Sequence, residues 1–97
     1  MKKMEEIRRE LAQYKPELKN RFGVKEIGIF GSFVKGEATE GSDLDILIEF
    51  EDSISLLKFV ELENYLSELL EVRVDLVMKS ALKPRIGKHI LEEVSII

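Results

Sequence analysis

Cysteine is absent from this sequence of 97 residues. Its absence excludes disulfide bonds, thiolate zinc sites and a cysteine nucleophile, and it removes any direct clue to the redox compartment. A cytoplasmic location is therefore a default expectation. A long apolar run is missing as well, because the first residues, MKKMEEIRRELAQY, alternate charged and apolar side chains. We therefore expect neither a signal peptide nor a membrane span in this segment, and no association with a membrane.

The chain also lacks an excess of positive charge. Its formal net charge is -4, so nothing attracts it generally to nucleic acid, whose binding depends on Lys and Arg at the phosphates. We expect no stable nucleic-acid partner, although a local basic patch could form from Lys79, Lys83, Arg85 and Lys88. With 44% hydrophobic residues, the length fits one small domain over residues 1–97, with a single core.

Helical and strand patterns alternate along the chain, which predicts an α/β (α+β) fold with a small mixed three-stranded sheet flanked by about four helices. Helical spacing is typical of residues 3–20, where Pro16 is expected to divide the segment into a helix and a further turn. Short apolar runs predict strands at residues 24–30, 43–50 and 72–78. The remaining helices are predicted at Phe33 and Val34, at 54–71, and from Pro84 to about Val94.

Two segments of this pattern have apolar surfaces that should pack against other parts of the protein or against a partner. The predicted helix over 54–71 carries a wide apolar face, made of Leu56, Phe59, Val60, Leu66, Leu69 and Leu70. After the last helix, residues 94–97 form an apolar tail that would suit an interface with another protein.

Two aspartates in the second predicted strand point to chemistry. Side chains at alternate positions of a strand share a face, so Asp43 and Asp45 project together from backbone positions about 6.8 Å apart. Both carboxylates could then reach one divalent cation, while Leu44, Ile46 and Ile48 face the core. An Asp-x-Asp pair alone is not specific, because exposed strands are often acidic, and the Gly31-Ser32 turn alone is not specific either. Their combination is what points to chemistry.

The order Gly31-Ser32, Gly36 and Ser42-Asp43-x-Asp45 resembles the GSxxxGxxxxxSDxD signature of minimal nucleotidyltransferase (MNT) domains, within the DNA polymerase β-like nucleotidyltransferase superfamily. The spacing matches without gaps. The resemblance covers essentially the whole chain and implies the nucleotidyltransferase fold. It also implies a third carboxylate on a following strand, for which Asp75 is the well-placed candidate.

By this resemblance, Asp43 and Asp45 would bind the metal ions that carry a triphosphate. Asp75 would complete a second metal site and help to activate the incoming hydroxyl. Two Mg²⁺ ions and ATP as substrate are implied, since two divalent ions can stabilise both the attacking and the leaving oxygen of an in-line displacement. Without metal, these carboxylates should repel one another and raise one another's pKa.

The glycine-serine turn has a different expected role. Gly31 lets the backbone approach a phosphate closely, and Ser32 adds a hydroxyl. The resemblance also assigns nucleotide binding to Ser42, although its position in the loop is equally well explained by a hydrogen bond to the backbone. Relatives often carry arginine just before Gly36; here Lys35 keeps the charge without the guanidinium fork.

Two functional classes remain open. MNT proteins are often encoded beside HEPN-domain ribonuclease toxins, so the resemblance implies an antitoxin that transfers AMP from ATP to a tyrosine hydroxyl of that partner. The alternative is a non-catalytic binding module that neutralises its partner by direct contact. A sheet of three strands has exposed edges, so self-association or a complex with the toxin is compatible with either class.

Overall fold

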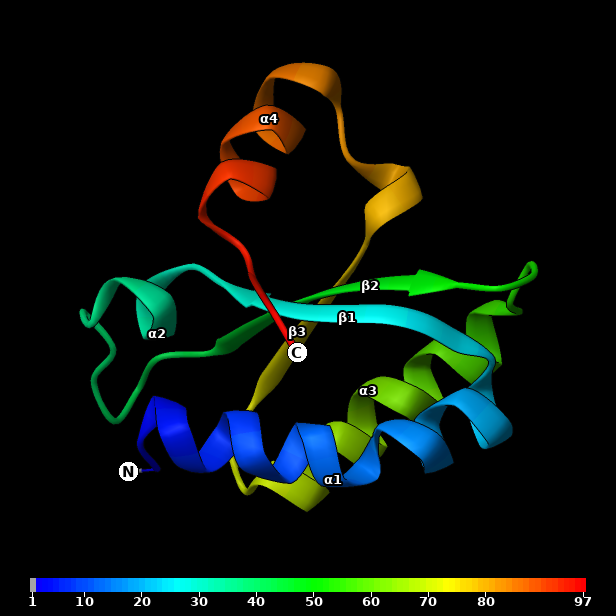
Figure 1. Cartoon of the computed structure of the whole chain (residues 1–97), viewed down its shortest axis with the longest axis horizontal. Coiled ribbons are helices and arrows are strands. Elements are labelled where there is room, and N and C mark those ends of the chain that lie inside the picture. The colour runs from blue at the N-terminus through cyan, green and yellow to red at the C-terminus, as the bar shows by residue number, and fades with distance from the viewer. Residues whose placement is uncertain (1) are drawn as a thin grey trace.

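The computed structural model describes residues 2–97 as a mixed four-stranded sheet with helices on both faces (Figure 1). The strand order is β3-β2-β1-β4. Strand β1 (Val24–Phe30) pairs antiparallel with β2 (Leu44–Phe50) and with β4 (Ser95–Ile96), whereas β2 pairs in parallel with β3 (Val74–Met78). The three predicted strands are confirmed, and their sheet is mixed as expected.

The fourth strand corrects the prediction of a three-stranded sheet. Residues 95 and 96 pair with Ile29 and Gly28, and the Ile97 N–H donates to the Ile27 carbonyl at 3.0 Å. Gly28 makes this close approach possible, because a Cβ on it would meet the Val94 side chain. The C-terminal tail, interpreted as an interface from sequence, thus closes one edge of the sheet.

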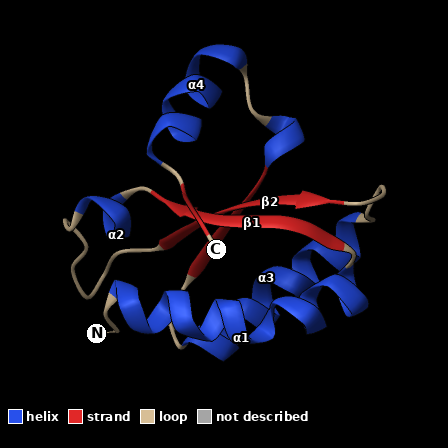
Figure 2. Cartoon of the chain, in the orientation of Figure 1, coloured by secondary structure: helices blue, strands red, loops and turns tan. Residues whose placement is uncertain are grey.

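The helices are distributed unequally over the two faces of the sheet. Helices α1 and α3 cover one face, and α4 stands over the other (Figure 2). None of the helices within residues 2–97 is long and apolar enough to cross a bilayer. The helical segments are α1 (Met4–Phe22), α2 (Ser32–Lys35), α3 (Leu56–Leu70), the short 3-10 helix η1 (Lys79–Ala81) and α4 (Pro84–Glu93).

The main core lies between the sheet and the α1/α3 layer. Leu44, Ile46 and Ile48 are fully buried there, as the alternation of β2 predicts. The residues between them point to the opposite face of the sheet. On the α4 side, β2 therefore carries the polar side chains of Asp45 and Glu49 together with Leu47, which is also buried.

Pro16 does not interrupt α1, contrary to the prediction. The helix continues to Phe22, with Leu11 and Leu18 fully buried on either side of the proline. Pro16 lies on the exposed side, and so does Ala12, whose carbonyl loses the N–H that a proline lacks. Packing of the buried side chains therefore maintains the helix across a local defect that water can satisfy.

The apolar face of α3 is narrower than predicted. Leu66 and Leu70 are fully buried, but Leu56 is 77% exposed and Val60 is 43% exposed. At about 100° per residue, Leu56 points about 80° away from Leu66 and Val60 about 120° away, so neither faces the core. Only the row of residues four apart, which also contains Leu62, packs fully against the sheet.

Truncation of Leu66 tests this account of the core. We expect Leu66→Ala to lower the free energy of unfolding by about 2–5 kcal/mol, because it leaves a cavity among fully buried side chains. Leu57, which lies on the same helix and is 84% exposed, provides a matched control, for which Leu57→Ala should change stability by less than about 0.5 kcal/mol. Urea unfolding followed by circular dichroism measures both; equal effects would contradict the assigned core face.

Candidate active site

The parallel pairing of β2 with β3 sets two of the predicted carboxylates side by side. Asp45 and Asp75 are direct partners in the register of these strands. Each is the second residue of its strand, and each points away from the core that buries Leu44 and Val74. Asp43 immediately precedes β2. The structure therefore brings the three aspartates to one edge of the α4 face of the sheet.

The electrostatics of Asp45 reflect this crowding. Its pKa is raised from 3.8 to about 6. Partial burial is the largest cause, followed by the negative charges of Asp75 and then Asp43, while Glu93 contributes less. Both desolvation and neighbouring negative charge disfavour an ionised carboxylate. The site is thus one in which a nearby cation would be strongly favourable.

Asp43 also interacts with a positively charged neighbour. Its Oδ1 lies 3.2 Å from Nε of Arg73, and the two side chains are 42% and 79% exposed. The backbones of the two segments are also hydrogen-bonded, because the Leu44 N–H donates to the Arg73 carbonyl at 2.8 Å. An ion pair this exposed stabilises the fold by about 0–1 kcal/mol, so Asp43 is free to exchange Arg73 for another cation.

The turn after β1 lies directly against Asp45. Gly31 has φ +80°, a value that favours glycine, and any Cβ at this position would collide with Asp45 Oδ2. The Gly31 carbonyl accepts hydrogen bonds from the N–H groups of Val34 and Lys35, which start α2. Ser32 is the first residue of that helix. Glycine is therefore required here for two separate reasons, backbone conformation and the space taken by the carboxylate.

Ser42 has a structural role in its loop. Its Oγ accepts a hydrogen bond from the Thr39 N–H at 2.9 Å, and its own N–H donates to the Thr39 carbonyl at 3.0 Å. These bonds close the turn that leads into Asp43 and β2. This geometry agrees with the architectural interpretation of Ser42, and its assignment to nucleotide binding stays a prediction.

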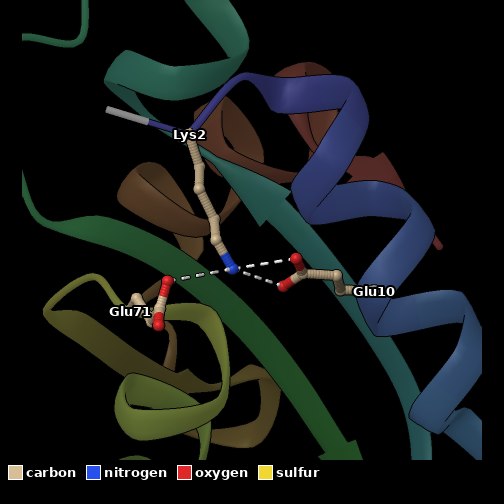
Figure 3. Close-up of polar contacts among 3 residues, drawn as sticks. All are labelled: Lys2, Glu10 and Glu71. Atoms are coloured by element: carbon tan, nitrogen blue, oxygen red, sulfur yellow. Dashed lines mark hydrogen bonds and ion pairs between the residues drawn. The ribbon is translucent and has the colours of Figure 1, made fainter.

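A pocket of about 360 Å³ opens next to Asp43, within the range of about 300–1,000 Å³ typical of small-molecule sites. Ser42, Arg73 and Lys2 contribute to its wall. Lys2 is held there by Glu10 at 2.8 Å and by Glu71 at 3.9 Å (Figure 3). The pocket therefore adjoins the aspartate cluster at Asp43, and its wall carries both positive and negative side chains, the latter including Glu40 and Glu71.

The donor set fits a hard divalent cation. Carboxylate oxygens are the protein ligands that Mg²⁺ prefers, and a cation would relieve the repulsion that raises the pKa of Asp45. Across residues 2–97, however, no three carboxylate or imidazole side chains are already arranged to hold a metal ion. The ion pair of Asp43 with Arg73 means that metal binding would draw Asp43 away from the guanidinium.

Two residues of the site were missed by the sequence analysis. Arg73 lies two residues before Asp75 in the chain, so the alternation along β3 was a usable signal that both belong to one face. Glu93, at the end of α4, accepts a hydrogen bond from the Gly31 N–H at 2.9 Å. It is 62 positions from Gly31, and no local pattern connects them. His89 is exposed.

The raised pKa of Asp45 predicts a pH dependence of stability. The folded protein holds this proton more tightly than the unfolded chain, so the stabilisation is complete below pH 3.8 and is lost as pH rises through about 6. We expect Asp45→Asn, in EDTA at pH 8, to melt about 4 °C above the wild type, equivalent to ~1 kcal/mol once the screening of this partly exposed carboxylate by water is allowed for. At pH 4 the two should agree. Asp52→Asn, in an exposed loop, is the control; a pH-independent gain would contradict the electrostatic cause.

Comparisons with known proteins agree with this architecture. A family model described as a nucleotidyltransferase domain matches residues 11–97. The chain is 62% identical over 91 residues to a protein named "Protein adenylyltransferase MntA" from Thermococcus cleftensis, with 94% of this chain and 92% of that protein covered.

Two solved structures share the fold. One, described as a putative minimal nucleotidyltransferase, superposes with a TM-score of 0.75 at 37% identity, covering 92% of this chain and 93% of that chain. The other is a tri-AMPylated Shewanella oneidensis HEPN toxin in complex with an MNT antitoxin; its TM-score is 0.68 at 20% identity, covering 93% of this chain and 70% of that chain. At this identity the second likeness concerns the fold alone. The chain belongs to the nucleotidyltransferase domain family.

Proposed function

We propose that this protein is a Mg²⁺-dependent protein adenylyltransferase that transfers AMP from ATP to a hydroxyl of a partner protein. The observation that carries the proposal is the β2–β3 register, which sets Asp45 beside Asp75 while Gly31 lies against Asp45. In the proposal, the turn that would bind phosphate and the carboxylates that would bind the cation are thereby adjacent. The name of the 62% identical relative supports protein as the acceptor.

In this proposal the aspartates position the reaction. Asp43 and Asp45 hold the metal-bound triphosphate, and Asp75 faces the incoming hydroxyl and helps to orient and deprotonate it. The hydroxyl oxygen forms a bond to the α-phosphorus, the bond from that phosphorus to the bridging oxygen breaks, and pyrophosphate leaves. Two bound Mg²⁺ ions would supply charge neutralisation at the attacking and leaving oxygens.

The partner we propose is a HEPN toxin in the cytoplasm, with a tyrosine hydroxyl as acceptor and this protein as its antitoxin. A tyrosine side chain can extend its hydroxyl from the partner surface to the open edge of the sheet where Asp45 and Asp75 lie. The sharing of fold with an MNT antitoxin in complex with a HEPN toxin is compatible with this pairing.

Amide substitutions test the roles of the carboxylates. We expect Asp43→Asn and Asp75→Asn each to reduce transfer of labelled AMP from ATP to the partner by about hundredfold or more, because changes in the shell around metal ligands alone cost about 10–100-fold. Mass spectrometry of both proteins after incubation with Mg²⁺ and ATP measures the transfer. Asp52→Asn is the matched control and should transfer normally. Full transfer by the double variant Asp43→Asn/Asp45→Asn would overturn the proposal.

The contact alternative makes a different prediction. The Asp43–Arg73 ion pair shows that one of the three aspartates has a positively charged partner without metal, as a binding module would need. If transfer is the mechanism, we expect the ribonuclease activity of the partner to remain in the absence of ATP and to fall by at least about tenfold after ATP and Mg²⁺ are added. Complete inhibition without ATP, retained by Asp75→Asn, would instead establish neutralisation by contact.

A further inference from the structure

Glu93 connects α4 to the glycine-serine turn through both carboxylate oxygens. Its Oε1 accepts the hydrogen bond of the Gly31 N–H at 2.9 Å, and its Oε2 lies 3.5 Å from Nζ of Lys35. The Glu93 side chain is 28% exposed, so the contacts are partly shielded from water. Figure 1 shows the end of α4 above the junction between β1 and α2, where these groups lie.

The position of this carboxylate is electrostatically unfavourable apart from those two contacts. Gly31 already has the Asp45 carboxylate against its Cα, so Glu93 adds a second negative charge on the same short turn. A hydrogen bond from a backbone N–H to a charged carboxylate is stronger than one between neutral groups. This hydrogen bond and the positive charge of Lys35 together offset the repulsion between Glu93 and Asp45. Glu93 is therefore a bound anion supplied by the chain itself.

The groups that bind Glu93 are those that a phosphate would use. An N–H donor and an ammonium group recognise carboxylate and phosphate oxygens by the same charge-assisted hydrogen bonds. A triphosphate placed at this turn, as the proposed function requires, would meet the Glu93 carboxylate at its own donors. The triphosphate and the Glu93 carboxylate cannot share these donors, because they would repel each other in addition to the repulsion that Asp45 exerts on both.

We infer that Glu93 is a positioning residue of the nucleotide site, whose carboxylate occupies the phosphate-binding donors of Gly31 and Lys35 until ATP displaces it. This inference rests on the proposed function. It makes ATP affinity depend on an internal competition: the apparent Kd is the intrinsic Kd divided by the fraction of molecules in which Glu93 has left the turn.

Helix α4 permits such a release by rotation of the Glu93 side chain alone, while β4 directly after it stays paired with β1. The helix has 10 residues and stands apart from the α1/α3 layer, on the opposite face of the sheet (Figure 2). Its apolar side chains are only partly packed, with Ile86 59% exposed and Leu91 48% exposed. Release of Glu93 would therefore disturb little of the main core.

The experiment compares Glu93→Gln with Glu92→Gln by isothermal titration calorimetry with ATP and Mg²⁺. Glutamine keeps an oxygen that accepts from the Gly31 N–H but removes the charge. We expect Glu93→Gln to bind ATP about tenfold more tightly, as when the competent fraction rises from about a tenth to nearly one. Glu92 is exposed on the same helix, and Glu92→Gln should stay within about twofold of the wild type.

Kinetics and a second variant separate positioning from a merely structural role. If Glu93 competes with phosphate, Glu93→Gln lowers KM for ATP by a similar factor and changes kcat less, and Glu93→Ala shows the same direction of effect. Weaker or unchanged ATP binding by a folded Glu93→Gln would overturn the inference, whether Glu93 then serves as a metal ligand or as a structural cap. Failure of the wild type itself to bind ATP would instead refute the proposed function.

Discussion

The parallel pairing of β2 with β3 is the constraint on which the site depends. Its register places Asp45 opposite Asp75, and the side-chain period of two sends both to the face that α1 and α3 do not cover. A shift of one residue in either strand would turn one aspartate into the core and bring out a leucine or valine. The burial of Leu44 and Ile46 on the other side excludes such a one-residue shift, so the same apolar residues that stabilise the fold also determine the face on which the carboxylates lie.

This arrangement explains why the crowded charges are tolerated. Burial of the apolar face supplies the stability, while Asp43, Asp45 and Asp75 lie at an edge that water reaches. Partial burial, followed by the negative charges of Asp75 and Asp43, raises the pKa of Asp45. Active sites commonly hold such perturbed groups, and here the pairing of β2 with β3 brings the neighbouring charge of Asp75 to Asp45.

The parts of the fold that could be predicted from the sequence are those encoded by local periodicity. The alternation of β2 identified the face that buries Leu44, Ile46 and Ile48, whereas the association of the Gly31-Ser32 turn with the aspartates came from the resemblance to MNT domains. Strand β4 could not be identified in this way, because two residues carry no alternation and its pairing with Gly28 joins segments far apart in the chain. The exposure of Leu56 and Val60 depends on which row of α3 packs against the sheet, which composition does not determine.

In the candidate site, too, some features could be predicted from the sequence and others depend on contacts across the fold. Asp75 was located through a resemblance, and its proximity to Asp45 follows from a register that no local pattern specifies. Arg73 and Glu93 each engage a residue of the predicted motif, Asp43 and Gly31 respectively, and both were missed because such contacts are made across the fold. In each case an acidic or donor group that the proposed chemistry requires is already satisfied by a partner from the chain. The free protein can therefore keep these groups ordered without ligands, and the strength of those internal contacts sets how readily ligands replace them.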